Sequence, residues 1–165
     1  MNRLLGVCLM ASVAASVMAA EVQVDPAEIR EVKGEKTRLS ANAPRVWAEG
    51  TKLRELQTLA PGQGSPANGA VDAASVIVRR QGRTLVKGKD YLADPVWGSL
   101  GLGPETTLTA SDEVEVDYRY SLRRLDSLVR AADGKEFVRR GTSALTVAEP
   151  PALEAGETRV ANIFV

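Results

Sequence analysis

The chain has 165 residues, with 21 Lys and Arg against 21 Asp and Glu, and it contains no histidine. The lack of histidine excludes a Ser-His-Asp or Cys-His catalytic site within the chain, and also histidine-bound zinc, copper or non-haem iron. A near-neutral chain with scattered charges also lacks the electrostatic footprint of a protein that binds nucleic acid or an anionic membrane.

The first twenty residues, 1–20, have the pattern of an export signal peptide. Arg3 provides a short positive start, Leu4 to Val17 form a largely apolar run, and Val17-Met18-Ala19 is a small-x-small cleavage signal. The apolar run is shorter than the roughly 20 residues that a transmembrane helix needs, so no membrane span is predicted. We therefore expect an exported, soluble protein, periplasmic or extracellular, whose mature part is a single domain of residues 21–165.

Cys8 is the only cysteine of the chain, and it lies within the predicted signal peptide. Its removal would leave the mature chain without a disulfide, a thiolate nucleophile or a cysteine metal site. The sequence thus predicts neither a cofactor nor a metal site, and the mature domain must be held together by its core alone.

The first third of the mature chain predicts short strands and loops. Between residues 21 and 43, two brief strands are expected around a turn at Lys33-Gly34-Glu35. The segment 43–59 has leucines at helical spacing but is interrupted by Gly50, so we expect a loop with one helical turn. Residues 61–69 combine Gly and Pro without an apolar period, which is typical of a surface loop.

A series of hairpins is predicted next. The β-branched run Ser75–Val78 is typical of a strand buried on both faces, and Gln81-Gly82 then forms a turn into a strand at Thr84–Val86. The following turns and strands are expected, in alternation, at Lys87–Asp90, Tyr91–Ala93, Asp94-Pro95 and Trp97–Leu100.

Glu113–Val129 contains the clearest strand pattern of the chain. Up to Leu122 every odd position is polar, and the apolar even positions are Val114, Val116, Tyr118, Tyr120 and Leu122. Because successive side chains of a strand point to opposite faces, this alternation predicts one buried and one solvated face. It ends at Arg123-Arg124, where we expect a bulge or a sheet corner. Arg124 and Asp126 are predicted to be structural residues of this corner, with the guanidinium paired with a carboxylate or with free carbonyl groups.

The last segments complete an all-β pattern. Asp133-Gly134 predicts a hairpin between Leu125–Ala131 and Lys135–Val138, and Val160–Val165 predicts a final apolar strand. Many short strands at turn-punctuated intervals, with no sustained helix, predict an all-β fold, either an antiparallel β-sandwich or a partly open barrel.

Carboxylates are the remaining candidates for catalysis or metal binding, and their pattern favours structural roles. Glu113, Glu115 and Asp117 share one face of a strand, but neighbours at i and i+2 lie roughly 6.5–7 Å apart, too far for the converging oxygens that calcium needs. A solvated strand face is the better interpretation. No catalytic residue is predicted, so we expect that the chain is not an enzyme.

Aromatic residues are the candidates for ligand contact. A sugar-stacking platform could be formed by Trp47, Tyr91, Trp97, Tyr118 and Tyr120, which makes a polysaccharide a candidate partner. Of these, Trp47, Tyr91 and Trp97 are the candidates for ligand contact, and Trp97 beside a turn is the first to test. Core filling is the favoured alternative for the aromatic residues as a group, because Tyr118 and Tyr120 fall on the buried side of the central strand.

The second half of the chain resembles a known family in the order of its features. These features are Asp90-Tyr91, Trp97-Gly98, Asp112–Tyr118, Arg124-x-Asp126, Asp133-Gly134, Gly141, Pro150-Pro151-x-Leu153, Gly156-Glu157 and Val160–Val165. Their order resembles the β-rich N-terminal leader of exported bacterial SGNH/GDSL-type hydrolases, esterases that typically remove acyl groups from carbohydrates or lipids. Phage-tail and surface-appendage β-modules share a similar arrangement. The Gly-Asp-Ser and Asp-x-x-His blocks of the hydrolases are absent from this chain, so the resemblance assigns no catalytic residue.

The resemblance implies a non-catalytic exported accessory β-domain with a positioning or weak glycan-contact role. The partner that it implies is a downstream hydrolase domain, with a domain boundary or a truncation point expected at Val165. The alternative is a self-contained structural or adhesion module of a cell-surface or appendage assembly.

Overall fold

The computed structural model describes residues 23–44, 49–56 and 69–165, and these residues form an all-β protein. The predicted signal peptide, Trp47 and the predicted surface loop other than Gly69 lie outside the described residues. In chain order the elements are β1 (Ile29–Arg38), β2 (Thr51–Lys52), the 3-10 turn η1 (Arg54–Leu56), β3 (Ile77–Arg80), β4 (Arg83–Thr84), β5 (Tyr91–Asp94), β6 (Ser99–Leu102), β7 (Glu113–Ser121), β8 (Leu125–Arg130), β9 (Glu136–Arg139) and β10 (Thr158–Phe164).

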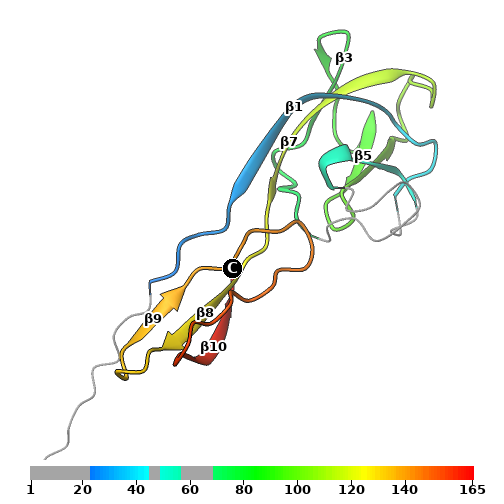
Figure 1. Ribbon diagram of the computed structural model, residues 1–165. Coiled ribbons are helices and arrows are strands. Elements are labelled where there is room, and N and C mark those ends of the chain that lie inside the picture. The colour runs from blue at the N-terminus through cyan, green and yellow to red at the C-terminus, as the bar shows by residue number, and fades with distance from the viewer. Residues whose placement is uncertain (1–22, 45–48, 57–68) are drawn as a thin grey trace, which may run out of the picture.

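The strands pair into three antiparallel sheets. A four-stranded sheet has the order β1-β7-β3-β4, and two three-stranded sheets have the orders β2-β6-β5 and β10-β8-β9. Figure 1 shows the first two sheets together in the upper part of the molecule, and β8, β9 and β10 in a separate lower part. The prediction of an all-β antiparallel, sandwich-like fold is confirmed.

The main hydrophobic core lies between the two upper sheets. Tyr91 of β5 and Leu100 of β6 belong to the same buried cluster as the apolar face of β7. The even-position prediction is confirmed, because the four apolar side chains of β7 and that of Leu122, directly after it, are each at most 5% exposed: Val114, Val116, Tyr118, Tyr120 and Leu122.

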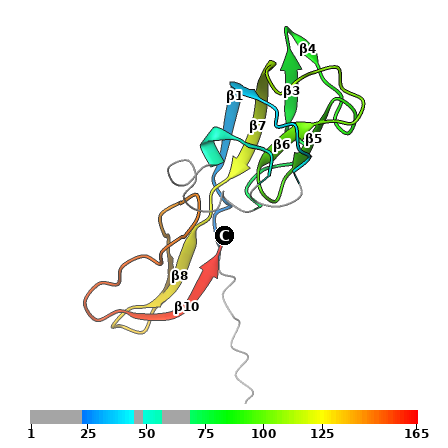
Figure 2. The ribbon, with the colours of Figure 1, turned by 90° about the vertical axis from the view of Figure 1, so that its right-hand side faces the viewer.

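Residues 122–124 connect β7 to β8 without reversing the chain, so one long strand runs from the upper sheets into the lower sheet (Figure 2). The N–H of Leu122 donates to the carbonyl oxygen of Glu28 at 2.9 Å, and that of Arg124 donates to Val165 at 3.0 Å. Adjacent residues of a strand direct their backbone groups to opposite edges, so Leu122 and Arg124 face the same edge. β1 and β10 therefore lie end to end along one edge of the long strand.

β1 is a single strand, so the prediction of two strands around a turn at Lys33-Gly34-Glu35 is wrong. Both halves of β1 pair with β7, and the register shifts between Val32 and Glu35. Gly34 has a φ of 62°, which allows the chain to bulge there. The chain continues rather than reverses because β7 provides pairing groups on both sides of the bulge.

β3 is covered on one face only, which differs from the predicted double burial of Ser75–Val78. Val78 is fully buried, whereas its neighbour Ile77 is 38% exposed. β3 lies between β7 and β4 in a sheet that packs against the core with a single face, so alternate side chains meet solvent.

The predicted turns of two hairpins are confirmed. Gln81 and Gly82 link β3 to β4 with φ values of 50° and 79°, and positive φ at both central residues is the signature of a type I′ turn. Gly134, with a φ of 86°, lies in the loop between β8 and β9. The 3-10 turn at Arg54–Leu56 likewise confirms the single helical turn predicted within residues 43–59.

Candidate functional site

Arg124 and Asp126 form a buried ion pair where the upper and lower sheets join. The two residues stand two apart along the chain, so their side chains emerge on the same face. Arg124 Nε donates to Asp126 Oδ1 at 2.7 Å, and Nη2 donates to Oδ2 at 2.9 Å. Arg124 is 0% and Asp126 1% exposed. This is the bidentate geometry in which a guanidinium holds a carboxylate most firmly.

Two further segments attach to this ion pair, the residues before β1 and those after β9. Arg124 donates to the carbonyl oxygens of Asp25 at 2.7 Å and Pro26 at 3.2 Å, and the N–H of Gly141 donates to Asp126 Oδ1 at 2.8 Å. A Cβ atom at position 141 would collide with the carbonyl oxygen of Leu125, so glycine is required there. Arg124, Asp126, Asp25, Pro26 and Gly141 are termed the waist cluster below.

The electrostatics of the waist cluster favour its charged form. The hydrogen bonds from Arg124 and from Gly141 outweigh burial and lower the pKa of Asp126. The hydrogen bond to Asp126 in turn raises the pKa of Arg124. Both groups therefore stay ionised at neutral pH, whereas a general acid or base needs a pKa near the working pH. The geometry is that of a structural clamp.

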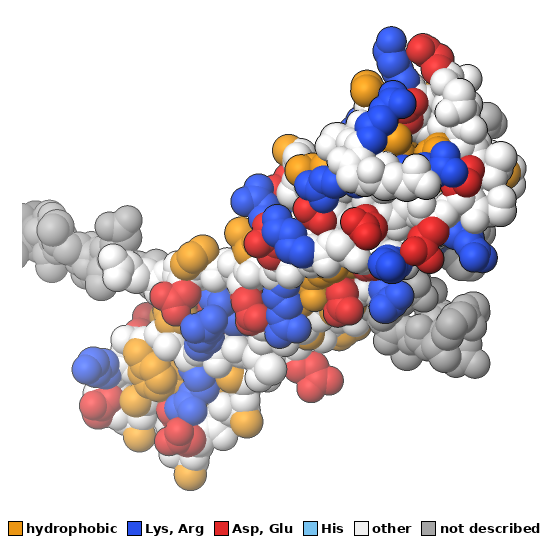
Figure 3. Space-filling view, turned by 90° about the horizontal axis from the view of Figure 1, so that it is seen from above, with side chains coloured by type: hydrophobic (Ala, Val, Ile, Leu, Met, Phe, Trp, Pro, Cys, Tyr) orange, Lys and Arg blue, Asp and Glu red, His pale blue; other side chains and the backbone are white. Residues whose placement is uncertain are grey.

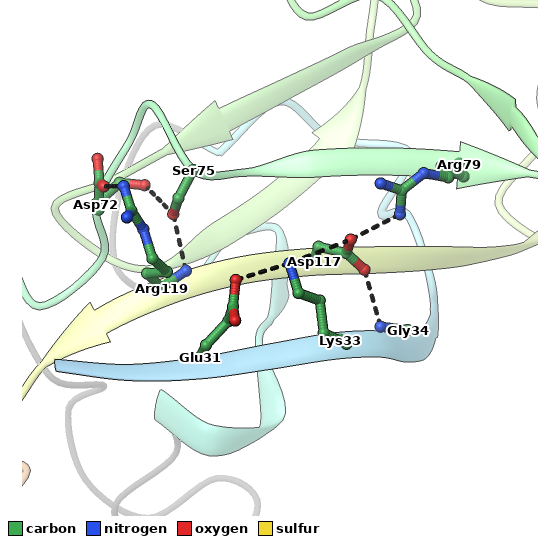
Figure 4. Close-up of polar contacts among 8 residues, drawn as sticks. All are labelled: Glu31, Lys33, Gly34, Asp72, Ser75, Arg79, Asp117 and Arg119. Carbon is green, nitrogen blue, oxygen red and sulfur yellow. Dashed lines mark hydrogen bonds and ion pairs between the residues drawn. The ribbon is translucent and has the colours of Figure 1, made fainter.

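Asp117 is a second enclosed carboxylate, on the polar face of β7 (Figure 4). It accepts hydrogen bonds from Gly34 N at 2.9 Å and Arg79 Nη1 at 2.8 Å, and Lys33 Nζ lies 4.0 Å away. These bonds lower the pKa of Asp117, and the hydrogen bond from Gly34 has the largest effect. Asp117 is only 8% exposed, so the predicted solvated face is wrong at this position. The bulge of β1 and the neighbouring arginine of β3 enclose it, and neither is visible in the alternation of β7.

Arg119 makes a further ion pair on the same face (Figure 4). Its Nη2 donates to Asp72 Oδ2 at 2.6 Å, while its backbone N–H donates to Ser75 Oγ at 2.7 Å. These bonds hold the segment before β3 against β7. Figure 3 shows basic and acidic side chains interspersed over the visible face, without a large area of one sign.

Glu35 and Tyr118 form a buried polar contact that the sequence did not predict. Tyr118 Oη donates to Glu35 Oε2 at 2.6 Å, and the N–H of Arg54 donates to Glu35 Oε1 at 2.8 Å. Burial has the largest effect on the pKa of Tyr118, followed by the hydrogen bond to Glu35. Both raise this pKa far above its ordinary value, so the phenol stays protonated and acts as a donor. The sequence signal that could have indicated this contact is the glycine within Lys33-Gly34-Glu35, because glycine inside a strand indicates a bulge. That Tyr118 is the partner of Glu35 could not be predicted, because it depends on how β1 pairs with β7.

The hollows near these residues are small and partly polar. One of about 380 Å³ opens beside the β1 bulge and is lined by residues 32–36 with Arg54 and Glu55. Within the described part of the chain, no three acidic, histidine or cysteine side chains are grouped in a way that could hold a metal ion.

The three aromatic candidates for ligand contact do not form a common surface in the described structure. Tyr91 is 2% exposed, and its hydroxyl donates to the carbonyl oxygen of Val76 at 3.1 Å, so its ring fills the core. Trp97 is half-buried, with its backbone N–H bonded to Asp94 Oδ1 at 3.1 Å. Trp47 lies outside the described residues. Of the two candidates that the structure describes, Trp97 is therefore the one that is not fully buried.

Comparisons of the chain with protein-family models, with curated proteins and with solved structures found no match. In the segments that the structure describes, no helix is long and apolar enough to cross a membrane.

Proposed function

We propose that this chain is an exported, non-catalytic β-domain that positions a neighbouring hydrolase domain and makes weak contact with glycan, as the accessory leader of an SGNH/GDSL-type carbohydrate esterase would. The observation that carries the proposal is the waist cluster. It fastens the upper sheets, the lower sheet and the segment before β1 to one another through directional bonds.

A positioning module needs a fixed angle between its parts. The long strand formed by β7 and β8 provides the connection, and the waist cluster restrains its bending where β7 ends. A buried ion pair adds little net stability compared with apolar packing of similar volume, so stability alone does not explain the pair. Its bidentate geometry and its backbone partners do explain a fixed orientation.

The state of the enclosed carboxylates supports a role without catalysis. Asp126, Asp117 and Glu35 each accept hydrogen bonds from at least two separate donors. For Asp126 and Asp117 these bonds lower the pKa, so both carboxylates are held in their charged form and are poor general acids. The chain also supplies no histidine as a partner for a nucleophile.

Glycan contact is assigned to the surface around Trp97. Trp97 is half-buried beside the turn that Asp94 organises, where Asp94 Oδ1 accepts the N–H groups of Val96 and Trp97. A rigid aromatic residue that is not fully buried in the core is suited to stacking on a sugar ring.

The test is a pull-down of the chain from Glu21 onward with insoluble acetylated polysaccharides, together with an assay of p-nitrophenyl acetate hydrolysis. We expect retention on at least one polysaccharide and no turnover above the buffer rate. Trp97→Ala should reduce retention several-fold without a change in melting temperature, and Val147→Ala, a change at a residue that is 77% exposed, should not.

Two outcomes would contradict the proposal. Turnover that a serine-directed fluorophosphonate abolishes would show that the chain is an enzyme. Capture of proteins without retention on any polysaccharide would favour the structural or adhesion module instead.

A further inference from the structure

The two edges of the lower sheet differ in charge. The sheet has the order β10-β8-β9, so β9 and β10 are both edge strands. Residues 135–140, at the β9 edge, include Lys135, Glu136, Arg139 and Arg140. β10 contains only one charged residue, Arg159. Charged side chains on an edge strand oppose pairing with a second chain, so the β9 edge is protected and the β10 edge is not.

The single charge of β10 is turned away from the open edge. Arg159 Nε donates to Ser127 Oγ at 3.0 Å, and Nη2 donates to the carbonyl oxygen of Pro151 at 2.6 Å. The remaining side chains from Val160 to Phe164 are uncharged, and Phe164 is 70% and Val160 43% exposed. An edge strand with uncharged side chains and an exposed aromatic residue at its end lacks the features that oppose pairing with another chain.

The backbone of β10 also presents free pairing groups. Val165 and Arg124 exchange N–H to carbonyl bonds of 2.9 and 3.0 Å, which makes them a hydrogen-bonded pair of the antiparallel ladder. Because such pairs alternate, Ile163 faces β8, whereas Asn162 and Phe164 direct their N–H and carbonyl groups outward. No strand of the described part of the chain lies beyond this edge, as both ribbon views show (Figure 1, Figure 2).

We propose that β10 pairs antiparallel with β10 of a second copy of this chain, about a twofold axis that places Ile163 of one copy opposite Ile163 of the other. Asn162 of each copy then faces Phe164 of its partner, and the outward groups of these two residues form four backbone hydrogen bonds. The two Phe164 rings become diagonal neighbours, at a separation of roughly 7–8 Å that aromatic side chains bridge. Two three-stranded sheets thereby join into one.

The composition of β10 favours a second copy of this chain as its pairing partner. The residues from Ala161 to Phe164 carry no charge that could recognise an acidic or a basic strand, so the strand that fits them is uncharged and partly apolar. β10 itself has that composition, and its self-pairing brings no like charges together. The register shift between Arg159 and Ala161 limits regular pairing to the residues after Val160. The contact is therefore short, and the dimer should be weak and concentration-dependent.

Sedimentation equilibrium of the chain from Glu21 onward, from micromolar to near-millimolar concentration, tests the proposal. The average mass should rise towards twice that of the monomer. Phe164→Lys should hold the chain monomeric over the whole range, because two like charges would then meet across the axis. Val147→Lys is the matched control, since it adds the same charge at an exposed valine outside β10 and should leave dimerisation unchanged.

Hydrogen exchange of the unmodified chain gives an independent readout that does not depend on the folding of a variant. Protection of the N–H groups of Asn162 and Phe164 should increase with concentration, whereas that of Ile163, which already faces β8, should not. A monomer at every concentration would overturn the proposal. A dimer that survives Phe164→Lys, or one that Val147→Lys also abolishes, would overturn it equally.

Discussion

The hydroxyl of Tyr118 lies 2.6 Å from a carboxylate oxygen of Glu35, although the two residues are 83 positions apart in the chain. The bulge in β1 makes this contact possible, because it turns a glutamate from a largely exposed strand towards the buried face of β7. The same carboxylate accepts the N–H of Arg54 and so fastens the 3-10 turn η1 to β1.

Tyr118→Phe tests this contact. The change removes one hydrogen-bond donor from a buried carboxylate and leaves the ring in place, so we expect the free energy of unfolding to fall by about 1.5–3 kcal/mol. Urea denaturation at neutral pH measures it. Tyr120→Phe is the control, because the Tyr120 hydroxyl interacts with the exposed side chain of Arg30 and its loss should cost less. Equal losses in the two variants would contradict the role of Glu35.

The register of β7 is tested by two neighbouring changes. Val116 is fully buried, so Val116→Asp places an unpaired carboxylate in the core and should unfold the domain or cost several kcal/mol. Glu115 is exposed, and Glu115→Ala should change stability by less than about 0.5 kcal/mol. Thermal melting followed by circular dichroism compares the two variants. Equal melting temperatures would show that the register is incorrect.

The waist cluster is tested by removing its charges singly and together. Arg124→Met leaves Asp126 buried without its partner, and we expect a loss of about 3–5 kcal/mol. The double variant Arg124→Met with Asp126→Leu should lose less than the sum of the two single changes, because neither charge is then left unpaired. Urea denaturation of the three variants measures this coupling. Strict additivity, or loss of polysaccharide retention at an unchanged melting temperature, would contradict a structural role.

Acid should destabilise the protein through Asp117 and Asp126. Both have a pKa below the value of about 3.9 for an unfolded aspartate, so the unfolded chain binds more protons at low pH. Their contribution to stability is complete above the unfolded pKa and is lost as pH falls through the folded pKa. The melting temperature should therefore decrease as the pH is lowered beyond about 4.

Asp117→Asn tests the contribution of Asp117 to this dependence of the melting temperature on pH. It should lower the melting temperature at neutral pH, because the amide cannot replace the carboxylate opposite Arg79, and it should make the fall in acid shallower. Melting curves measured at a series of pH values provide the comparison. Parallel profiles for the variant and the unmodified chain would mean that Asp117 is not involved.

Local patterns in the sequence determined the fold class and several elements. The alternation from Val114 to Leu122 predicts which face of β7 is buried, since the direction of a strand side chain depends only on its position in the chain. Gln81-Gly82 and Asp133-Gly134 similarly predict their hairpins, because a tight turn needs residues that tolerate positive φ within the turn itself.

The tertiary structure decided everything that depends on pairing between distant segments. Lys33-Gly34-Glu35 suits a turn and a bulge equally well, and it becomes a bulge because β7, some eighty residues later, pairs with β1 on both sides of it. Asp117 has the same local pattern as Glu115, yet it is enclosed because Gly34 and Arg79 lie opposite it. Arg124 and Asp126 are separated by one residue in the sequence, but their partners Asp25, Pro26 and Gly141 are set by the meeting of three separate chain segments. Burial and hydrogen bonding are properties of neighbours in space, and these neighbours are fixed only when the sheets assemble.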